Sequence, residues 1–270
     1  MKLSNLNFHQ TFPPDGNMIS RLLTSDIFNI ALSKEEISQH TGIPTGKSSG
    51  KVEPHIKYAE YMGLLWDSFS EGKHTLSLTP LGKCILEEDP SLSEKVAVLT
   101  CYLQMTAVFD GAPLWETIIA EILPRNRFII TEAALRDTLS KETDVLINYG
   151  PFFSSFEDAF FSSLQIVERS KGTVRVKKQR YEADLVYVYA YAFFEEWEAR
   201  YPDRDELTAD EISTFLMPGT LGWLSQDFYI IMEHMQEKRL LSFNRQLVPY
   251  IVTKHNSAEE LLPKLFSELC

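Results

Sequence analysis

One segment of the chain, from Ser33 to Leu86, constrains its fold more than any other. Ser33 is followed three residues later by Glu36, the capping-box pattern in which each residue's side chain satisfies a free backbone donor of the other at a helix start. The sequence TGIP over residues 41–44 then predicts a tight turn, because glycine favours a left-handed cap and the residue before proline avoids helical geometry. We therefore expect a short helix that ends near His40.

A longer helix and a hairpin follow this turn. The helix is predicted from Ser48 or Ser49 to Met62. The sequence SEGK at residues 70–73 predicts the turn of a hairpin, and Pro80 closes its return strand. With a first helix predicted over residues 17–32, the order helix, helix, turn, helix and β-hairpin is that of a winged helix-turn-helix.

The same order of elements recurs twice further along the chain, in a less complete form. In the second occurrence Thr131 is expected to cap a helix to Leu139, and a helix is expected over residues 152–164. A hairpin over residues 165–177 then turns at Ser170–Gly172. The third occurrence is predicted over residues 208–254 and begins with a capping threonine, Thr208.

Two long predicted helices, over residues 92–122 and 182–200, join these units, and the second is apolar nearly all round, which places it in the core. The expected fold class is mainly α with small β-hairpins (α+β), organised as tandem winged helix-turn-helix units joined by long helices. The expected domains are residues 1–90, an N-terminal arm with a winged helix-turn-helix; residues 91–181, a helical connector with a second winged-helix-like unit and a basic wing; and residues 182–270, the central helix with a C-terminal winged-helix-like unit.

The charge balance restricts where nucleic acid can bind. The chain has 38 acidic and 26 basic residues, a net charge of −12, which works against nonspecific attraction to phosphate, so that any DNA contact must be local. Residues 169–180, RSKGTVRVKKQR, contain no acidic residue and lie on the predicted second wing. The six basic residues expected to be uncompensated there are Arg169, Lys171, Arg175, Lys177, Lys178 and Arg180. Such a ribbon suits a DNA groove or backbone, although it also suits an acidic partner, and solvated lysine-rich hairpins are common.

The helix after the TGIP turn is a second candidate for DNA contact. Val52, Ile56 and Ala59 are expected to face inward. Lysine and serine at a helix N-terminus suit phosphate, because the free amides and the helix dipole favour an anion. The alternative is a protein-binding helix, since Glu53 and Glu60 dilute the positive charge. The outward-facing residues predicted to contact DNA are Lys47, Ser49, Lys51, His55 and Lys57.

No catalytic, metal-binding or cofactor-binding residue is predicted. The sequence GIPTGKS at residues 42–48 has three residues between its glycines where a P-loop has four, and it follows a helix rather than a strand. The three cysteines and six histidines lack metal-ligand spacing, and no serine lies in a nucleophile elbow. The opening residues lack a signal-peptide pattern and no stretch reaches membrane-spanning length, so a cytoplasmic protein is expected.

Four segments carry a resemblance to a known family. They are NFHQTFPP at residues 7–14, SSGKVEPHIKYAEYMGLL at 48–65 with LSLTPLG at 76–82, SFEDAFFSSLQIVE at 155–168, and MPGTLGWLSQDFYIIMEHM at 217–235. With these segments the chain resembles, over almost its whole length, an uncharacterised bacterial and archaeal family of winged-helix proteins described only as a domain of unknown function. Its members are often encoded beside phosphoadenosine phosphosulfate reductase-like proteins of DNA phosphorothioate modification and phage defence. The resemblance implies a role in DNA modification or antiphage defence.

The leading hypothesis is a non-enzymatic DNA-binding protein, a regulatory or specificity subunit linked to DNA modification or antiphage defence. Its expected partners are double-stranded DNA and the proteins of a modification or defence complex, with no membrane contact. A homodimer fits this hypothesis, because winged regulators commonly dimerise to span two half-sites. Two alternatives stay open: a protein–protein scaffold without direct DNA contact, and a cryptic metal-dependent nuclease assembled from distant carboxylates.

Overall fold

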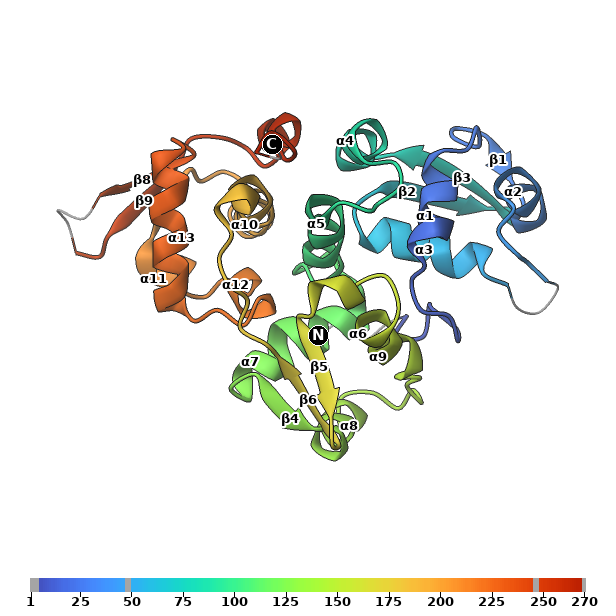
Figure 1. Cartoon of the computed structure of the whole chain (residues 1–270), viewed down its shortest axis with the longest axis horizontal. Coiled ribbons are helices and arrows are strands. Elements are labelled where there is room, and N and C mark those ends of the chain that lie inside the picture. Colours follow the sequence, from blue (N-terminus) through green and yellow to red (C-terminus); the bar gives the residue numbers. More distant parts are fainter. Residues whose placement is uncertain (1–4, 47–49, 245–247, 269–270) are drawn as a thin grey trace.

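The structure is a computed structural model that describes residues 5–46, 50–244 and 248–268. It contains three small units, each with a three-stranded antiparallel sheet. Figure 1 shows the N-terminal unit on the right, the central unit at the bottom and the C-terminal unit on the left. The helices α5 (Lys95–Met105) and α10 (Val186–Arg200) pack against each other between the N-terminal and C-terminal units. The predicted class, mainly α with small β-hairpins, is confirmed.

All three sheets have the same strand order, β1-β3-β2, β4-β6-β5 and β7-β9-β8. In each, a short first strand pairs with the return strand of a later hairpin, so that the return strand lies in the middle of the sheet. The N-terminal strands are β1 (Ala31–Leu32), β2 (Leu65–Ser70) and β3 (Lys73–Leu78). The central strands are β4 (Ile129–Thr131), β5 (Val167–Ser170) and β6 (Thr173–Val176), and the C-terminal strands are β7 (Glu206–Thr208), β8 (Leu241–Asn244) and β9 (Ile251–Lys254).

The first strand of each unit leads into a helix that a hydroxyl side chain caps, as predicted. The caps are Ser33, Thr131 and Thr208, whose hydroxyls accept from the backbone N–H three residues on. The capped helices are α2 (Lys34–Thr41), α8 (Glu132–Ser140) and α11 (Ala209–Ile212). The next long helix before each hairpin is α3 (Val52–Tyr61), α9 (Gly150–Glu157) or α13 (Ser225–Glu237). The remaining helices are α1 (Gly16–Leu23), α4 (Pro80–Glu88), α6 (Pro113–Trp115), a π-helix over residues 116–122, α7 (Leu123–Arg125), α12 (Met217–Thr220) and 3-10 turns at 162–164, 183–185 and 259–264.

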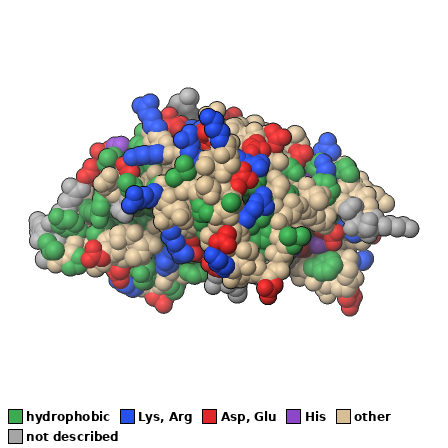
Figure 2. Space-filling view, turned by 90° about the horizontal axis from the view of Figure 1, so that it is seen from below, with side chains coloured by type: hydrophobic (Ala, Val, Ile, Leu, Met, Phe, Trp, Pro, Cys, Tyr) green, Lys and Arg blue, Asp and Glu red, His purple; other side chains and the backbone are tan. Residues whose placement is uncertain are grey.

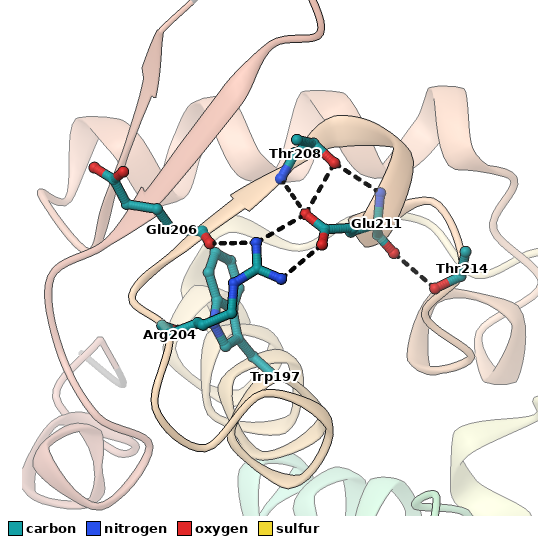
Figure 3. A network of polar contacts seen from close by, with 6 residues as sticks. All are labelled: Trp197, Arg204, Glu206, Thr208, Glu211 and Thr214. Atoms are coloured by element: carbon teal, nitrogen blue, oxygen red, sulfur yellow. Dashed lines mark hydrogen bonds and ion pairs between the residues drawn. The ribbon is translucent and has the colours of Figure 1, made fainter.

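The cap of α11 is reinforced by an ion pair (Figure 3). Glu211 accepts hydrogen bonds from the backbone N–H and the hydroxyl of Thr208, and the Arg204 guanidinium bonds both of its oxygens at 2.7 and 3.1 Å. The hydrogen bond from Arg204 and the capping bonds lower the pKa of Glu211 to about 2. The start of this helix is therefore fixed by a group that stays ionised at neutral pH.

Four predicted helices are shorter than expected. The helix predicted over residues 17–32 ends at Leu23, because the following residues turn through Asn29 at a φ of 60° and then form β1. The helix predicted over 92–122 is broken between α5 and α6 by Phe109, at a φ of 82°, and by Pro113, which cannot continue a helix. The helix predicted over 152–164 ends at Glu157. The helix predicted from Ser48 or Ser49 begins at Val52.

The core is continuous across the three units, and α10 is buried along almost its entire length, which confirms its predicted central place. The N-terminal arm ties two units together. Phe8 packs against Tyr58 of α3 and Trp115 of α6, with ring centroids 5.0 and 5.7 Å apart. The side chain of Asn7 bonds the backbone of Leu146 and of Asn148 at 2.9 Å. Among the described residues, no helix is both long and apolar enough to cross a membrane.

Candidate nucleic-acid interface

The six basic residues predicted on the second wing are only partly free. Arg169 makes two hydrogen bonds to Glu132, at 2.7 and 3.0 Å, and its guanidinium lies 4.4 Å from the ring centroid of Phe153. The hydrogen bond from Arg169 lowers the pKa of Glu132. Arg169 is thus bound to the start of α8, and the prediction that it is uncompensated is wrong.

Two further cations of this cluster are also paired. Arg175 on β6 bonds Glu168 at 2.9 Å, directly across the hairpin in the register of the strands. Lys178 bonds Asp227 at the start of α13 at 2.6 Å, and this bond lowers the pKa of Asp227. The acidic partners of these cations lie outside residues 169–180. The lack of acidic residues within that segment therefore did not mean that its basic residues are unpaired.

The other three cations, Lys171, Lys177 and Arg180, have no ion pair within the part of the chain that the structure describes. Lys171 is exposed at the tip of the hairpin, and Arg180 is exposed beyond it. Val174 and Val176 of β6 are buried, which turns the alternate residues Arg175 and Lys177 to the outer face of the sheet.

A fourth cation, Arg127, also lacks an ion pair among the described residues, and it was missed from the sequence. It is exposed and lies two residues before β4, and the Val176 N–H donates to the carbonyl of the next residue, Phe128, at 3.0 Å, which places Arg127 near the end of β6. Figure 2 views the molecule from below, where Lys and Arg side chains lie scattered over the middle of the face with acidic side chains between them. We name the four residues Arg127, Lys171, Lys177 and Arg180 the free basic set.

The predicted DNA-contacting helix of the N-terminal unit has a different surface. Lys47 and Ser49 lie outside the described residues. His55 is 1% exposed, so the prediction that it faces outward is wrong. The N-terminal arm lies against the same helix, where the hydroxyl of Tyr58 donates to the Phe12 carbonyl at 2.9 Å. Lys51 is half-buried, with its ammonium 5.7 Å from the Phe12 ring centroid.

Lys57, the remaining predicted contact on α3, belongs to a polar network beneath the hairpin β2–β3. Its ammonium lies 2.5 Å from Glu60 and 3.6 Å from the fully buried carboxylate of Asp67, which also bonds the Nδ1 of buried His74 at 2.9 Å. Burial lowers the pKa of Lys57, but the hydrogen bond to Glu60 and the two negative charges more than offset this, so that the pKa is raised. This lysine holds the unit together.

A seam joins the central and C-terminal units directly after the hairpin β5–β6. The Gln179 N–H donates to the Leu221 carbonyl at 2.9 Å, and the Trp223 indole donates to the Gln179 carbonyl at 2.8 Å. Gly222 has a φ of 69°, and a Cβ there would lie 2.9 Å from the Cα of Lys178. The basic segment is therefore clamped to the C-terminal unit at a position that only glycine fits.

An apolar pocket of about 190 Å³ opens at this seam. Its walls come from both units, and it too was missed from the sequence, because its two halves lie about ninety residues apart. The central unit contributes Ala120, Pro124 and Phe128. The C-terminal unit contributes Ile212, Ser213, Phe215, Leu216, Pro218, Gly219, Trp223, Leu224, Phe228, Tyr229 and Met232.

Several carboxyl groups elsewhere have raised pKa values. Burial raises the pKa of Glu116 to about 7, and it also raises the pKa of Glu195 and Glu196. Glu196 accepts from the N–H groups of Leu216 and Met217, both at 2.8 Å, and so holds the start of α12. Over residues 5–46, 50–244 and 248–268, no group of three or more His, Cys, Asp or Glu side chains is arranged to hold a metal ion.

Comparison with known proteins gives a likeness in fold. No protein-family model matches the chain, and no curated protein matches it. Two solved structures do: a magnesium ion-bound SspB crystal structure, with a TM-score of 0.74, and an SspB crystal structure, with a TM-score of 0.73. Each is 14% identical in sequence, and each alignment covers 98% of this chain and 87% of the other. At that identity, the likeness shows that the chain has the fold seen in these SspB structures.

Proposed function

We propose that the protein binds double-stranded DNA through the outer face of its central sheet, without catalysing a reaction, and that its three units are winged helices. The free basic set carries this proposal. Lys171 lies at the tip of the hairpin, Lys177 and Arg180 follow β6, and Arg127 precedes β4, whose neighbouring residue Phe128 bonds the end of β6. In a chain with a net charge of −12, cations gathered on one β-ribbon are the feature that suits a phosphate backbone.

The biological setting is part of the same proposal. The four sequence segments that resemble a family encoded beside DNA phosphorothioation and phage-defence genes support it. The likeness in fold to SspB is compatible with it. We propose a cytoplasmic regulatory or specificity subunit whose protein partners belong to a DNA modification or defence complex. A homodimer that spans two half-sites fits this role, and sedimentation of the protein with and without DNA tests it.

A salt titration of DNA binding tests the central claim. The double variant Lys177→Glu/Arg180→Glu should weaken binding to a random-sequence duplex at least tenfold, and should lower the slope of log affinity against log salt by about 2, since each phosphate contact contributes about 0.9. The matched control is Lys73→Glu/Lys83→Glu, which makes the same change in net charge at two exposed lysines of the N-terminal unit. Equal losses in both variants, or no salt-dependent binding of the unaltered protein, would contradict the proposal.

A second function, protein binding, is favoured by one observation on the N-terminal unit. Its hairpin exposes two large aromatic side chains, Trp66 at 58% and Phe69 at 59%, and such residues are typical of protein interfaces. If this hairpin binds a protein of the same complex, Trp66→Ala/Phe69→Ala should abolish co-purification with the products of neighbouring genes and leave DNA affinity unchanged. Unchanged co-purification would remove this second function.

A further inference from the structure

We propose that the apolar pocket at the seam receives one unpaired nucleobase of a bound DNA strand. This inference rests on the proposed function, because it requires DNA on the adjacent basic face. The pocket measures about 190 Å³, which is too small for a drug-sized ligand, whose sites run to about 300–1,000 Å³. A single planar heterocycle is the class of ligand that this size favours.

The walls of the pocket are suited to stacking. Aromatic rings line it from both units: Phe128 from the central unit, and Phe215, Trp223, Phe228 and Tyr229 from the C-terminal unit. Phe215, Trp223 and Phe228 are buried, whereas Phe128 and Tyr229 are half-buried and so remain open to an entering ring. Base–aromatic stacking tolerates any sequence, because every base has a π-face. Polar groups are few, so the pocket would hold a base without reading it closely.

The backbone that carries Phe128 is in an unfavourable conformation. Arg127 and Phe128 have φ values of 56° and 66°, in the left-handed region, which is a genuine outlier for a residue as bulky as phenylalanine. Two hydrogen bonds hold it there: the Phe128 N–H donates to the Leu123 carbonyl at 2.7 Å, and its own carbonyl accepts from Val176. This conformation positions the ring that lines the pocket, directly after the exposed Arg127.

Charge at the rim favours nucleic acid over an apolar protein side chain. Arg127 directly precedes the lining residue Phe128 and is exposed, whereas Lys178, across the seam, is already paired with Asp227. A cation beside an aromatic pocket can hold a phosphate that flanks an extruded base, while the rings receive the base itself. An apolar segment of a partner protein would not need this flanking positive charge.

A DNA-binding assay with matched duplexes tests the inference. The unaltered protein should bind a duplex with a single bulged thymine at least tenfold more tightly than the fully paired duplex, because an unpaired base is extruded at little cost. Phe128→Gly should abolish this preference and leave affinity for the paired duplex unchanged. Glycine adopts the left-handed conformation without penalty, so this variant removes the ring and keeps the fold. Tyr229→Ala should reduce the preference, and Ile230→Ala, one residue along α13 and 56% exposed outside the pocket, should not.

Photocrosslinking locates the base directly. 5-Iodouracil at the bulged position should form an adduct with Phe128, Trp223 or Tyr229, which peptide mass spectrometry identifies. Equal affinity for the two duplexes, or adducts only outside the pocket, overturns the base pocket and leaves DNA binding intact. Absence of binding to either duplex at low salt overturns the proposed function itself. If an apolar peptide, but not bulged DNA, protects the Phe128 side chain from hydroxyl-radical labelling, the pocket receives a protein side chain, and this result would also overturn the inference.

Discussion

The hairpins β2–β3 and β5–β6 have nearly the same backbone and opposite surfaces. Their turns, Glu71–Gly72 and Lys171–Gly172, have φ values of 51° and 76° in the first and 50° and 75° in the second, as a two-residue type I′ turn requires. Both return strands lie in the middle of their sheets. The first hairpin exposes Trp66 and Phe69, whereas the second exposes Arg175. The shared backbone positions the hairpin, and the outward side chains determine what it can bind.

The two units also differ in where their charges point. In the N-terminal unit Lys57, Asp67 and His74 meet beneath the hairpin. In the central unit the ion pairs of Arg169 and Arg175 lie at the surface, and the free basic set is exposed except for Lys177, which is half-buried. Removal of one partner from a buried ion pair destabilises the fold, because the other partner is left buried and unpaired, whereas exposed charges contribute little to stability and remain available to a ligand. We therefore expect substitutions in the first unit to affect stability and substitutions in the second to affect binding.

The largest expected effect is on the buried network. Asp67→Ala should lower the free energy of unfolding by about 3 kcal/mol, because it removes the fully buried carboxylate that bonds the buried His74 and lies beside Lys57. Urea denaturation measures it. The control is Glu168→Ala, which removes the partner of Arg175 at the surface and should cost less than about 1 kcal/mol. Similar losses in the free energy of unfolding in the two variants would contradict the difference in charge burial between the two units.

The next effect is a pH dependence that comes from the N-terminal arm. Burial lowers the pKa of His9 from 6.5 to about 4. Above pH 6.5 His9 is neutral in both the folded and the unfolded states. As the pH falls from 6.5 towards 4, only the unfolded state takes up a proton at His9, so the free energy of unfolding decreases. Between pH 7.5 and pH 5 this amounts to about 2 kcal/mol.

A matched variant isolates the histidine from other titrating groups. Burial raises the pKa of Glu116 to about 7, so this group acts in the opposite direction over part of the same range. His9→Phe keeps an aromatic ring beside Phe8 and Trp115 and removes the titration. Its free energy of unfolding should fall less between pH 7.5 and pH 5 than that of the unaltered protein. An identical fall in both proteins would show that His9 is accessible to protons in the folded state.

A smaller effect, on binding, compares the two turns at equivalent positions. Lys171→Glu should weaken DNA binding five- to tenfold, about 1 kcal/mol, and lower the salt slope by about 1. Glu71→Lys makes the reverse change at the matching position of the first hairpin and should leave DNA affinity within about twofold. A filter-binding titration in two salt concentrations measures both. A gain in affinity from Glu71→Lys as large as the loss from Lys171→Glu would mean that DNA lies across both hairpins.

The local signals in the sequence predicted this repeated backbone well. Capping residues such as Ser33 and Thr208 and both hairpin turns lie where they were expected. Signals of this kind depend on residues three or four apart, which the sequence shows directly. The prediction of a helix over 17–32 was wrong at its end, where the structure depends on a distant part of the chain. Ala31 and Leu32 fit a helical spacing, but they pair with β3, more than forty residues away.

The candidate site depended on contacts that the sequence does not show. Arg169 and Lys178 are neutralised by Glu132 and Asp227, 37 and 49 positions away along the chain. His55 was expected to face outward because the spacing within its helix accounts for only one buried face, whereas the N-terminal arm covers another. The pocket at the seam requires two units to be placed together, and no local pattern of residues specifies that placement.

The smallest expected effect tests whether the two turns are equivalent in energy as well as in shape. Glu71 and Lys171 are non-glycine residues in the left-handed region, where asparagine is better tolerated than either. Glu71→Asn and Lys171→Asn should each raise the free energy of unfolding by about 0.5 kcal/mol, a rise of about 1–2 °C in Tm for a chain of this size. Calorimetry measures the stability, and the same proteins report on binding, because only Lys171→Asn removes a cation from the free basic set. Equal gains in stability, with a loss of DNA affinity in Lys171→Asn alone, would show that the two turns have the same backbone energetics and that only the second hairpin contributes to DNA binding. Unequal gains would mean that the side chains of the two turns also differ in what they contribute to folding.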